Sequence, residues 1–515
     1  MKQRKRTIGL LFLALWGTAW MSEAVAQGPI SIRGKVTASG SSLEGAYVAA
    51  HADGKASTTY VMTDGNGQFT FQGLAPGRYA VFTRIPGFRV ARRDGVAVQA
   101  GREAAADFQV EPETNFLSLL EQASNSELQD SFPLSETERQ ALDHRCADCH
   151  GASYIAKSRF TLRDWQLVVA AMDDQRRTTP AGDISPPTRM SRPSARHAGA
   201  EEGPISDESI AAMLAKIRGP DSPDFPIKFR PRATGRLTRA VVTEYQIPRI
   251  GATTRAVLVD PNTGYVWYTD WRSNILGRID PRRGEIKEYP IPAGKPGRPP
   301  GFQYLRWDPL GYLLAGQIWT GAGVRFDVKN EKVANLWQTP IEWARTGNLD
   351  VCRSNGRILY RIGDGLARQQ SWLIDPETNA FTEIRRGGAA PDVPCDGGRD
   401  YNGWDGGFSP GGGKRVITYK DPATGQTREF TMPSRWSRPY NAVGDPRGKT
   451  GWSAPDVTDL MVKADLTTGE MTEWPLPSHG KEVRNIDIDL STNPPSVWFP
   501  NQRLGRVIRF QEYVE

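Results

Sequence analysis

The second half of the chain contains an internal repeat that constrains the fold more than any other sequence feature. An aspartate that opens an Asp-x-x-x-Gly segment, or a close variant, recurs every 44 to 48 residues, at Asp280, Asp327, Asp375, Asp421 and Asp465. A Glu-aromatic-x-x-Pro segment recurs as well, at 244–248, 288–292, 429–433 and 473–477. Repeats of about 40 to 50 residues made of short strands are typical of β-propellers, with one blade per repeat. Residues 239–515 are therefore predicted to form a propeller.

The two ends of this region complement each other. The last copy, from Val497 to Phe510, lacks a final strand, whereas residues 241–248 read as a strand without the rest of a blade. One blade shared between the two ends would close the ring and remove two exposed sheet edges. Counted in this way, the propeller has six blades, with seven as the alternative.

The N-terminus has the features of a secretory signal. Basic residues at 2–6 precede an apolar run at 7–21 and a small-residue cleavage site at 24–26. Residues 1–26 are predicted to be a signal peptide, which implies an exported, periplasmic protein. The alternative is an uncleaved anchor, although the run is short for a membrane span. No other run is long enough, so no membrane span is expected in the mature chain.

The charge pattern argues against one class of partner. The formal net charge is +7 over 515 residues. The basic residues are scattered along the sequence and do not form a cluster. Binding to nucleic acid is therefore not indicated.

Residues 30–112 read as short strands separated by turns, which predicts a small β-sandwich. The segments G-x-V at 34–36, T-D-x-x-G-x-F at 63–69 and L-x-P-G-x-Y at 74–79 resemble the carboxypeptidase regulatory-like domain. This resemblance implies a non-catalytic spacer or an adhesion module.

Residues 113–220 are predicted to form a small all-α domain, so the chain as a whole is expected to be multidomain and mainly β. Ser135 and Glu138 form a capping box that begins a helix. Apolar residues at helical spacing predict two more helices, at 161–172 and 206–217. A Pro-, Ser- and Arg-rich loop at 178–204 separates those two helices. Residues 221–238 show no periodicity and read as a linker.

The first predicted helix leads into Cys146-Ala-Asp-Cys149-His150, which fits the C-x-x-C-H motif of haem attachment. At this spacing each thiol can reach one vinyl group, and the adjacent imidazole reaches the iron from the same side. The motif resembles that of the cytochrome c family, which implies one covalent haem c on Cys146 and Cys149, with His150 as an axial ligand. The alternative is a disulfide or redox-active pair in which His150 has no role.

The second axial ligand is predicted to be Met172. The pattern W-x-x-V-V-x-x-M at 165–172 resembles compact bacterial cytochromes in which this methionine binds the iron, and a thioether there raises the potential. Met190, His197 or an open position are the alternatives, and Met172 could equally be part of a helix core.

Cys352 and Cys395 are far from the motif and separated by 43 residues. Export to an oxidising compartment permits a disulfide between them. Because their separation is close to the repeat length, we expect them at equivalent places on neighbouring blades.

The propeller resembles the streptogramin (virginiamycin B) lyase family, through Val-Trp-Tyr-Thr-Asp at 266–270 and Ile-Leu-Gly-Arg-Ile-Asp at 275–280. That family has seven blades, a histidine base and glutamates that hold magnesium. The positions matching the histidine and one glutamate are Asn485 and Pro500 here. His479 with Glu482 is the only local substitute, in a turn expected to be exposed. A magnesium-dependent carbon–oxygen lyase is therefore an alternative that we do not favour.

Polar residues are expected where each innermost strand begins, around the central funnel of the propeller. They are Arg255, Arg306, Asn348, Asn402, Asn441 and Asn485. The alternative is that the asparagines cap turns.

The favoured function is that of a periplasmic c-type cytochrome that transfers electrons. Its propeller would bind or oxidise an unidentified small molecule, and its redox partner would be a dehydrogenase or another cytochrome. A non-catalytic binding scaffold or a haem sensor is the other alternative besides the lyase.

Overall fold

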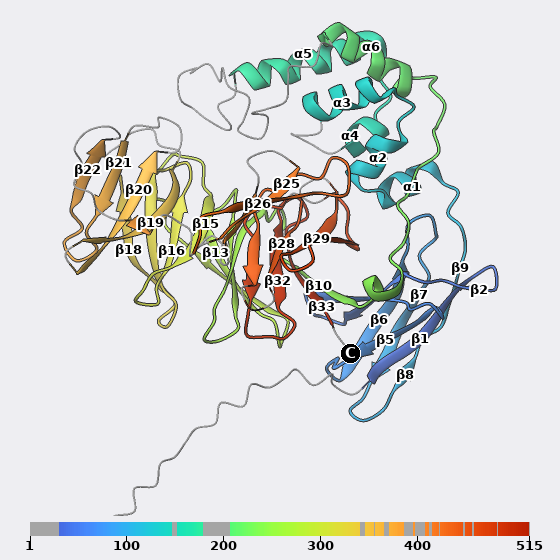
Figure 1. The fold of residues 1–515 in the computed structure, drawn as a ribbon, viewed down its shortest axis with the longest axis horizontal. Helices are drawn as coiled ribbons and strands as arrows, with labels where there is room; N and C mark the ends of the chain where they lie inside the picture. Colours follow the sequence, from blue (N-terminus) through green and yellow to red (C-terminus); the bar gives the residue numbers. More distant parts are fainter. Residues whose placement is uncertain are drawn as a thin grey trace, which may run out of the picture.

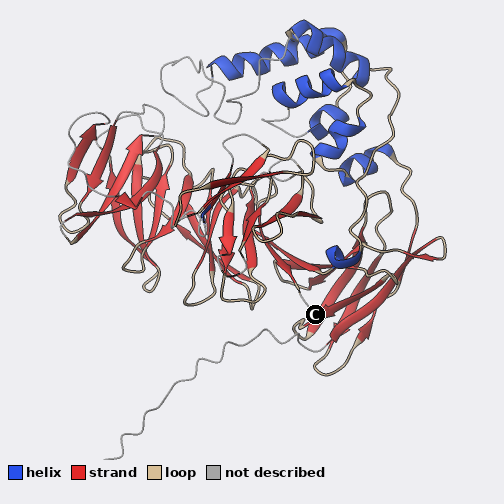
Figure 2. Ribbon diagram, viewed as in Figure 1, coloured by secondary structure: helices blue, strands red, loops and turns tan. Residues whose placement is uncertain are grey.

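A computed structural model describes residues 30–146, 152–178, 206–339, 346–354, 356–364, 370–385, 395–396, 407–410, 415–421, 423–445, 447, 449–455, 458–480 and 483–513. These residues form an N-terminal β domain, a helical segment and a propeller, which confirms a mainly β, multidomain chain (Figures 1 and 2). The predicted signal peptide lies outside the described residues. A bilayer-spanning helix needs about 20 apolar residues, and no described helix combines such length with such apolar character.

The N-terminal domain consists of two sheets around one core, as expected for a sandwich. One sheet has the order β2-β1-β5, with β8 and β9 also paired to β1, and the other contains β4-β3-β6-β7. Val36 and Phe69 from the first sheet pack with Val48 and Val81 from the second. The strands are β1 (Ile30–Ala38), β2 (Ser41–Ser42), β3 (Tyr47–Ala52), β4 (Ser57–Met62), β5 (Gln68–Gln72), β6 (Gly77–Arg84), β7 (Arg92–Val98), β8 (Ala104–Ala105) and β9 (Phe108–Val110).

Strand β3 is buried on both faces. Alternate side chains point to opposite faces of a strand, and Val48 and Ala50 lie in the sandwich core. Tyr47 and Ala49 lie in a second core that contains propeller residues, among them Trp474. The Tyr47 hydroxyl also donates a hydrogen bond to the Pro475 carbonyl, at 2.7 Å. The apolar run in β3 thus reflects a strand that lies between two domains.

The helical segment contains the three predicted helices and, among the described residues, three more that were not predicted. Its helices are α1 (Phe116–Gln122), α2 (Asn125–Ser131), α3 (Glu136–Arg145), α4 (Ala152–Lys157), α5 (Leu162–Thr178) and α6 (Asp207–Arg218). The predicted capping box of Ser135 and Glu138 begins α3, and a second one begins α2. Apolar residues of all six helices share one core, which includes Leu142 of α3 and Trp165 of α5.

The stretch predicted to be a linker is packed against all three parts of the chain. It has no regular structure before the short 3₁₀ helix η2 (Gly235–Thr238). Phe225 is buried in the helical core. Arg230 donates hydrogen bonds to Ser126 of α2 and to the carbonyl of Thr458 in the propeller. Arg232 donates to the carbonyl of Glu44 in the N-terminal domain. This stretch is therefore held by contacts with all three parts of the chain, and we call residues 221–238 the strap.

The propeller consists of six antiparallel sheets in the part of the chain that the structure describes, in agreement with the six blades counted. Innermost strands contact one another around the ring: β11 with β15, β15 with β19, β27 with β31 and β31 with β11. In blade four, β24 contacts the innermost strand β27 of the next blade. Blade one is β11 (Thr254–Val259), β12 (Val266–Asp270), β13 (Ile275–Asp280) and β14 (Glu285–Pro290). Blade two is β15 (Phe302–Trp307), β16 (Leu313–Gln317), β17 (Ala322–Asp327) and β18 (Lys332–Gln338).

The remaining blades follow the same order. Blade three is β19 (Thr346–Ser354), β20 (Arg357–Asp364), β21 (Gln370–Ile374) and β22 (Phe381–Arg385), with β23 (Cys395–Asp396) beside β19. The described strands of blade four are β24 (Phe408–Pro410), β25 (Val416–Lys420) and β26 (Thr427–Thr431). Blade five is β27 (Val443–Asp445), β28 (Thr450–Ser453), β29 (Leu460–Asp465) and β30 (Met471–Pro475). Blade six is β31 (Asp487–Asp489), β32 (Ser496–Asn501), β33 (Arg506–Glu512) and β10 (Ala240–Gln246).

The repeated aspartate has a local structural cause. In each of five blades it opens the turn between the third and fourth strands, and its carboxylate accepts a hydrogen bond from the backbone N–H two residues later. The residue four positions after it has a left-handed backbone conformation in every copy, with φ from 52° to 79°. These residues are Gly284, Glu331, Asn379, Gly425 and Gly469. Glycine adopts this conformation without strain, which explains why the pattern usually ends in glycine.

Strand β10 closes the ring as predicted and also joins the N-terminal domain. It pairs with β33 along its whole length, from Ala240 opposite Glu512 to Gln246 opposite Arg506. Its other edge pairs with β4, where Val242 lies opposite Tyr60. The result is one eight-stranded sheet in the order β31-β32-β33-β10-β4-β3-β6-β7. The N-terminal domain is thus continuous with blade six and is not a separate spacer.

The expected position of the second cysteine pair is corrected by the strand pairing. Cys352 lies on β19, directly opposite Cys395 on β23, in the same sheet, whereas we expected neighbouring blades. Directly opposed residues of antiparallel strands have Cα atoms about 4.5 to 5.5 Å apart, within reach of a disulfide. Cys352 is disulfide-bonded, and Cys395 is the cysteine that the strand register places beside it.

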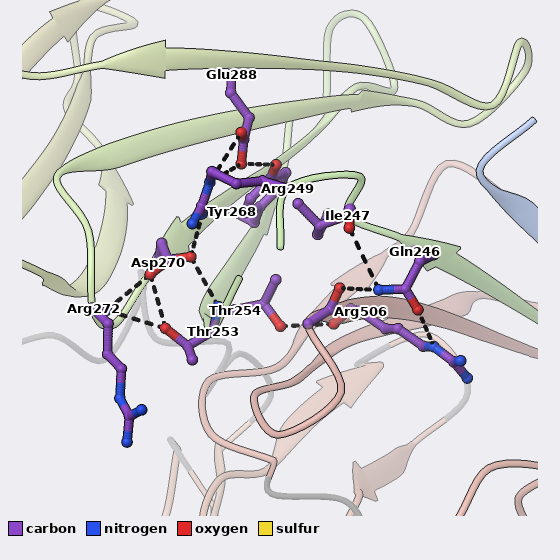
Figure 3. A network of polar contacts seen from close by, with 11 residues as sticks. Gln246, Ile247, Arg249, Thr253, Thr254, Tyr268, Asp270, Arg272, Glu288 and Arg506 are labelled. Atoms are coloured by element: carbon purple, nitrogen blue, oxygen red, sulfur yellow. Dashed lines mark hydrogen bonds and ion pairs between the residues drawn. The ribbon is translucent and has the colours of Figure 1, made fainter. Parts of the chain in front are cut away.

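A polar network reinforces the junction between the first and last blades (Figure 3). The carboxylate of Asp270, which is fully buried, accepts hydrogen bonds from the Thr253 N–H at 2.9 Å and the Arg272 N–H at 2.8 Å. Arg249 bridges Asp270 and Glu288. Burial by itself raises the pKa of Asp270, but the hydrogen bonds from Thr253, Arg249 and Arg272 outweigh it and leave the pKa below its ordinary value.

We predict that Asp270→Asn lowers the free energy of unfolding by about 2 kcal/mol at pH 7, because it removes charge-assisted hydrogen bonds. A carboxyl whose pKa is depressed by folding stabilises the protein above its unfolded pKa of about 3.9, and this contribution is lost on further acidification. In urea unfolding, the difference in free energy of unfolding between the wild type and Asp270→Asn should therefore be constant from roughly pH 5 to pH 7. This difference should become smaller below about pH 4. Glu285→Gln, at an exposed position of β14, serves as the control and should change stability by less than about 0.5 kcal/mol.

We also predict that the disulfide of Cys352 is formed with Cys395. The loop closed would contribute about 4 kcal/mol on the chain-entropy estimate, so Cys352→Ser and Cys395→Ser should destabilise the protein equally. Alkylation of the denatured, unreduced protein followed by mass spectrometry should leave both cysteines unlabelled, and reduction should expose both. Labelling of Cys395 before reduction would contradict the pairing.

Candidate functional site

Helix α3 carries the first residue of the C-x-x-C-H motif. Cys146 is the C-cap of this helix, and its N–H donates to the Leu142 carbonyl. Its side chain is half-buried against the helical core. Cys149 and His150 lie outside the described residues.

Met172, the predicted second ligand, lies on α5. Trp165 and Val169 of this helix are buried in the helical core, and Val168 packs against it. Met172 follows at helical spacing and is half-buried, so it lies on the core-facing side of α5. Met190 and His197 lie outside the described residues. Only Cys146 and Met172 of the predicted haem residues are described, so haem binding stays a prediction.

One loop of the propeller docks onto the helices that precede the motif. This loop joins β26 to β27, and we call its residues 435–441 the docking loop. The indole N–H of Trp436 donates to Asp130 of α2 at 3.0 Å. Arg435 pairs with Glu136, and Arg438 pairs with Asp143, both on α3. The contacts place the helical segment on the side of the propeller where chains enter the innermost strands, which we call the funnel face (Figure 1).

The docking loop ends among the predicted funnel residues. Arg255, on the innermost strand β11, is 5% exposed. Its guanidinium lies 4.1 Å from the centre of the Trp271 ring and donates to the Tyr440 hydroxyl at 3.2 Å. It also donates to the Gln502 side-chain oxygen at 3.1 Å. A second buried guanidinium, of Arg484, lies 4.8 Å from the centre of the Tyr440 ring. Two cations therefore converge on Tyr440.

Two tyrosines of this group are coupled. Burial and the neighbouring Tyr440, which shares a side-chain hydrogen bond with it, raise the pKa of Tyr304 to about 12, although Arg255 acts in the opposite direction. The Tyr304 hydroxyl thus stays protonated at neutral pH and can donate a hydrogen bond. Arginine, tyrosine and tryptophan side chains at one place can stack on planar groups and bind carboxylates or phosphates.

The structure places the six predicted funnel residues in different surroundings. The backbone N–H of Asn485 donates to the Arg255 carbonyl at 3.3 Å, so these two residues meet. Asn441 is buried and its carbonyl accepts from Ser453. Arg306 lies instead near the end of β15 and forms a 2.7 Å ion pair with Asp350. The strand pairing places Arg306 level with Leu258 of β11, and not level with Arg255. Asn348 lies on β19, but its side chain is outside the described residues, as is all of Asn402.

His479 is not in an exposed turn, contrary to the expectation. Its side chain is 15% exposed, and its Nδ1 atom lies 3.7 Å from the buried carboxylate of Asp459. Glu482 lies outside the described residues. Among the described residues no group of three histidine, cysteine, aspartate or glutamate side chains is arranged to hold a metal ion.

Sequence reasoning missed the aromatic and second basic members of the funnel group. Tyr440 and Arg484 each directly precede a predicted residue, and Trp271 directly follows the 266–270 signature. The pair Tyr-Asn occurs twice, at 401–402 and 440–441. This recurrence was the one sign in the sequence that Tyr440 could belong to the funnel group. Only the closed arrangement of the propeller blades brings Tyr440 to Arg255.

Comparisons with known proteins identify the N-terminal domain. Residues 31–111 match the model of the carboxypeptidase regulatory-like domain, which confirms that prediction. A search of curated proteins finds no relative of this chain.

Solved structures similar to this chain are propellers of low sequence identity. A streptogramin B lyase structure is 15% identical, with a TM-score of 0.39, and the match covers 54% of this chain and 100% of the lyase. A virginiamycin B lyase from Staphylococcus aureus is 14% identical, with a TM-score of 0.30, and 53% and 99% of the two chains are covered. A gluconolactonase from Xanthomonas campestris is 12% identical, with a TM-score of 0.32, and the coverage is 52% and 89%. At such values the likeness concerns the fold of the propeller alone and carries no argument about chemistry.

Proposed function

We propose that this protein is an exported, periplasmic c-type cytochrome in which one covalent haem exchanges electrons with a small molecule held in the propeller funnel. The C-x-x-C-H motif at the end of α3 is the observation that carries this proposal. Cys146 and Cys149 would hold the haem, and His150 and Met172 would bind its iron. When bound, the haem supplies a one-electron redox centre. A dehydrogenase or another cytochrome would be the redox partner.

The docking of the helices supports a link between the motif and the funnel. Arg438 holds α3 one turn before Cys146, and Tyr440 of the same loop contacts Arg255 in the funnel. A molecule at the funnel would therefore lie on the side of the propeller that carries the motif. The two buried guanidiniums favour an anionic molecule, and the surrounding rings favour a planar one.

The first test concerns the haem itself. Protein produced with haem-maturation machinery should contain about one haem per chain in a pyridine haemochrome assay, because the sequence has a single such motif. The haem should stay attached in denaturing gels, and Cys146→Ser with Cys149→Ser should abolish the attachment. Cys352→Ser is the matched control and should retain it. A wild-type chain without haem would end the cytochrome proposal.

The second test concerns the axial ligand. Met172→Ala should remove the weak sulfur-to-iron band in the far-red spectrum of the oxidised protein and lower the midpoint potential, because thioether ligation raises it. Met190→Ala should leave both unchanged. The opposite result for the two variants would assign the ligand to Met190.

A further inference from the structure

The helical segment and the N-terminal domain are attached to the propeller in different ways. The N-terminal domain shares a sheet with blade six and contributes Tyr47 and Tyr60 to a common apolar core. Among the described residues, the apolar core of the helical segment contains no propeller side chain. The hydrogen bonds and ion pairs that the structure describes between this segment and the propeller come from the docking loop. Polar interfaces of this kind commonly permit movement between domains.

Four residues form the exposed part of this contact, and we call them the latch: Asp130, Glu136, Arg435 and Trp436. Arg435 pairs with Glu136, and its Nη1 atom lies 3.7 Å from Oδ1 of Asp130. Its guanidinium also lies 4.5 Å from the centre of the Trp436 ring. The side chains of Arg435, Asp130 and Glu136 are 44%, 36% and 56% exposed. Water and salt therefore weaken the ion pairs of the latch.

The docked arrangement also carries two unfavourable features. Trp436 has a φ of 63°, a left-handed conformation that is strained for a bulky residue. Gln129 is fully buried, and neither atom of its side-chain amide has a hydrogen-bond partner among the described residues. Ser126, Gln129 and Asp130 lie on the side of α2 that contacts the strap and the docking loop. Departure of the docking loop would let Trp436 relax and would let water reach the amide.

We propose that the helical segment is a movable cap on the funnel face, which the latch holds closed. When the latch opens, the segment pivots about α1, which lies beside the N-terminal domain (Figure 1). There the side chain of Gln122 accepts a hydrogen bond from the Gly87 N–H at 2.7 Å. The docking loop continues into Tyr440, which contacts Arg255 of the funnel, so the open form changes the approach to the funnel group. The movement requires neither haem nor ligand and goes beyond the proposed function.

Hydrogen exchange of the full chain, measured by mass spectrometry, tests the proposal. Asp130→Asn combined with Glu136→Gln should accelerate exchange of the backbone amides of residues 436–438 several-fold, because water reaches them when the docking loop leaves the helices. Raising the salt concentration from about 20 mM to about 500 mM should have the same effect on the wild type, also if the double variant fails to fold. Gln129→Leu should slow this exchange, because it removes an unpaired amide from the docked state.

The controls separate movement of the cap from unfolding. Glu121→Gln removes the exposed partner of Lys157 within the helical segment and should change nothing. Exchange in α6 and β10 should stay slow in every variant, and small-angle X-ray scattering should give a larger radius of gyration for the double variant.

Four results would overturn the inference: unchanged exchange in the docking loop, acceleration by Gln129→Leu, equal acceleration in α6, or faster loop exchange at a constant radius of gyration. Absence of haem would instead overturn the proposed function alone.

Discussion

Strand β10 holds the architecture together because both of its edges are hydrogen-bonded to other parts of the chain. One edge completes blade six with β33, and the other continues into the N-terminal domain through β4. A propeller has to join its ends, and a strand at a sheet edge has to be covered or paired. Here one seven-residue strand meets both requirements.

The shared sheet fixes where the other parts can lie. Because β3 and β4 have a core on each face, the N-terminal domain cannot tilt away from blade six without exposing Tyr47 and Tyr60. The strap of residues 221–238 then runs from the helices past this domain and into β10, with Arg230 and Arg232 bonded on either side. These constraints, together with the docking loop, keep the helical segment on the funnel face.

The electrostatics of this face follow from burial. Arg255 and Arg484 lie against aromatic rings, where a guanidinium keeps a favourable partner at low hydration. Arg438 and Asp143 neutralise each other beside the motif. Charges in such surroundings act over a longer range than surface pairs do.

Local patterns in the sequence determined most elements of this protein. The Asp-x-x-x-Gly turns, the capping box of Ser135 and the missing strand of the last blade are local or periodic signals, and each predicted its element correctly. The C-x-x-C-H motif is equally local, and it is why haem could be proposed from the sequence. Only the tertiary structure decided that β4 pairs with β10, that Cys395 faces Cys352 within one sheet, and that Arg306 pairs with Asp350 and not with the funnel group. Those outcomes depend on strand register and on which surfaces meet between segments far apart in the sequence, and neither is encoded in the spacing of a repeat.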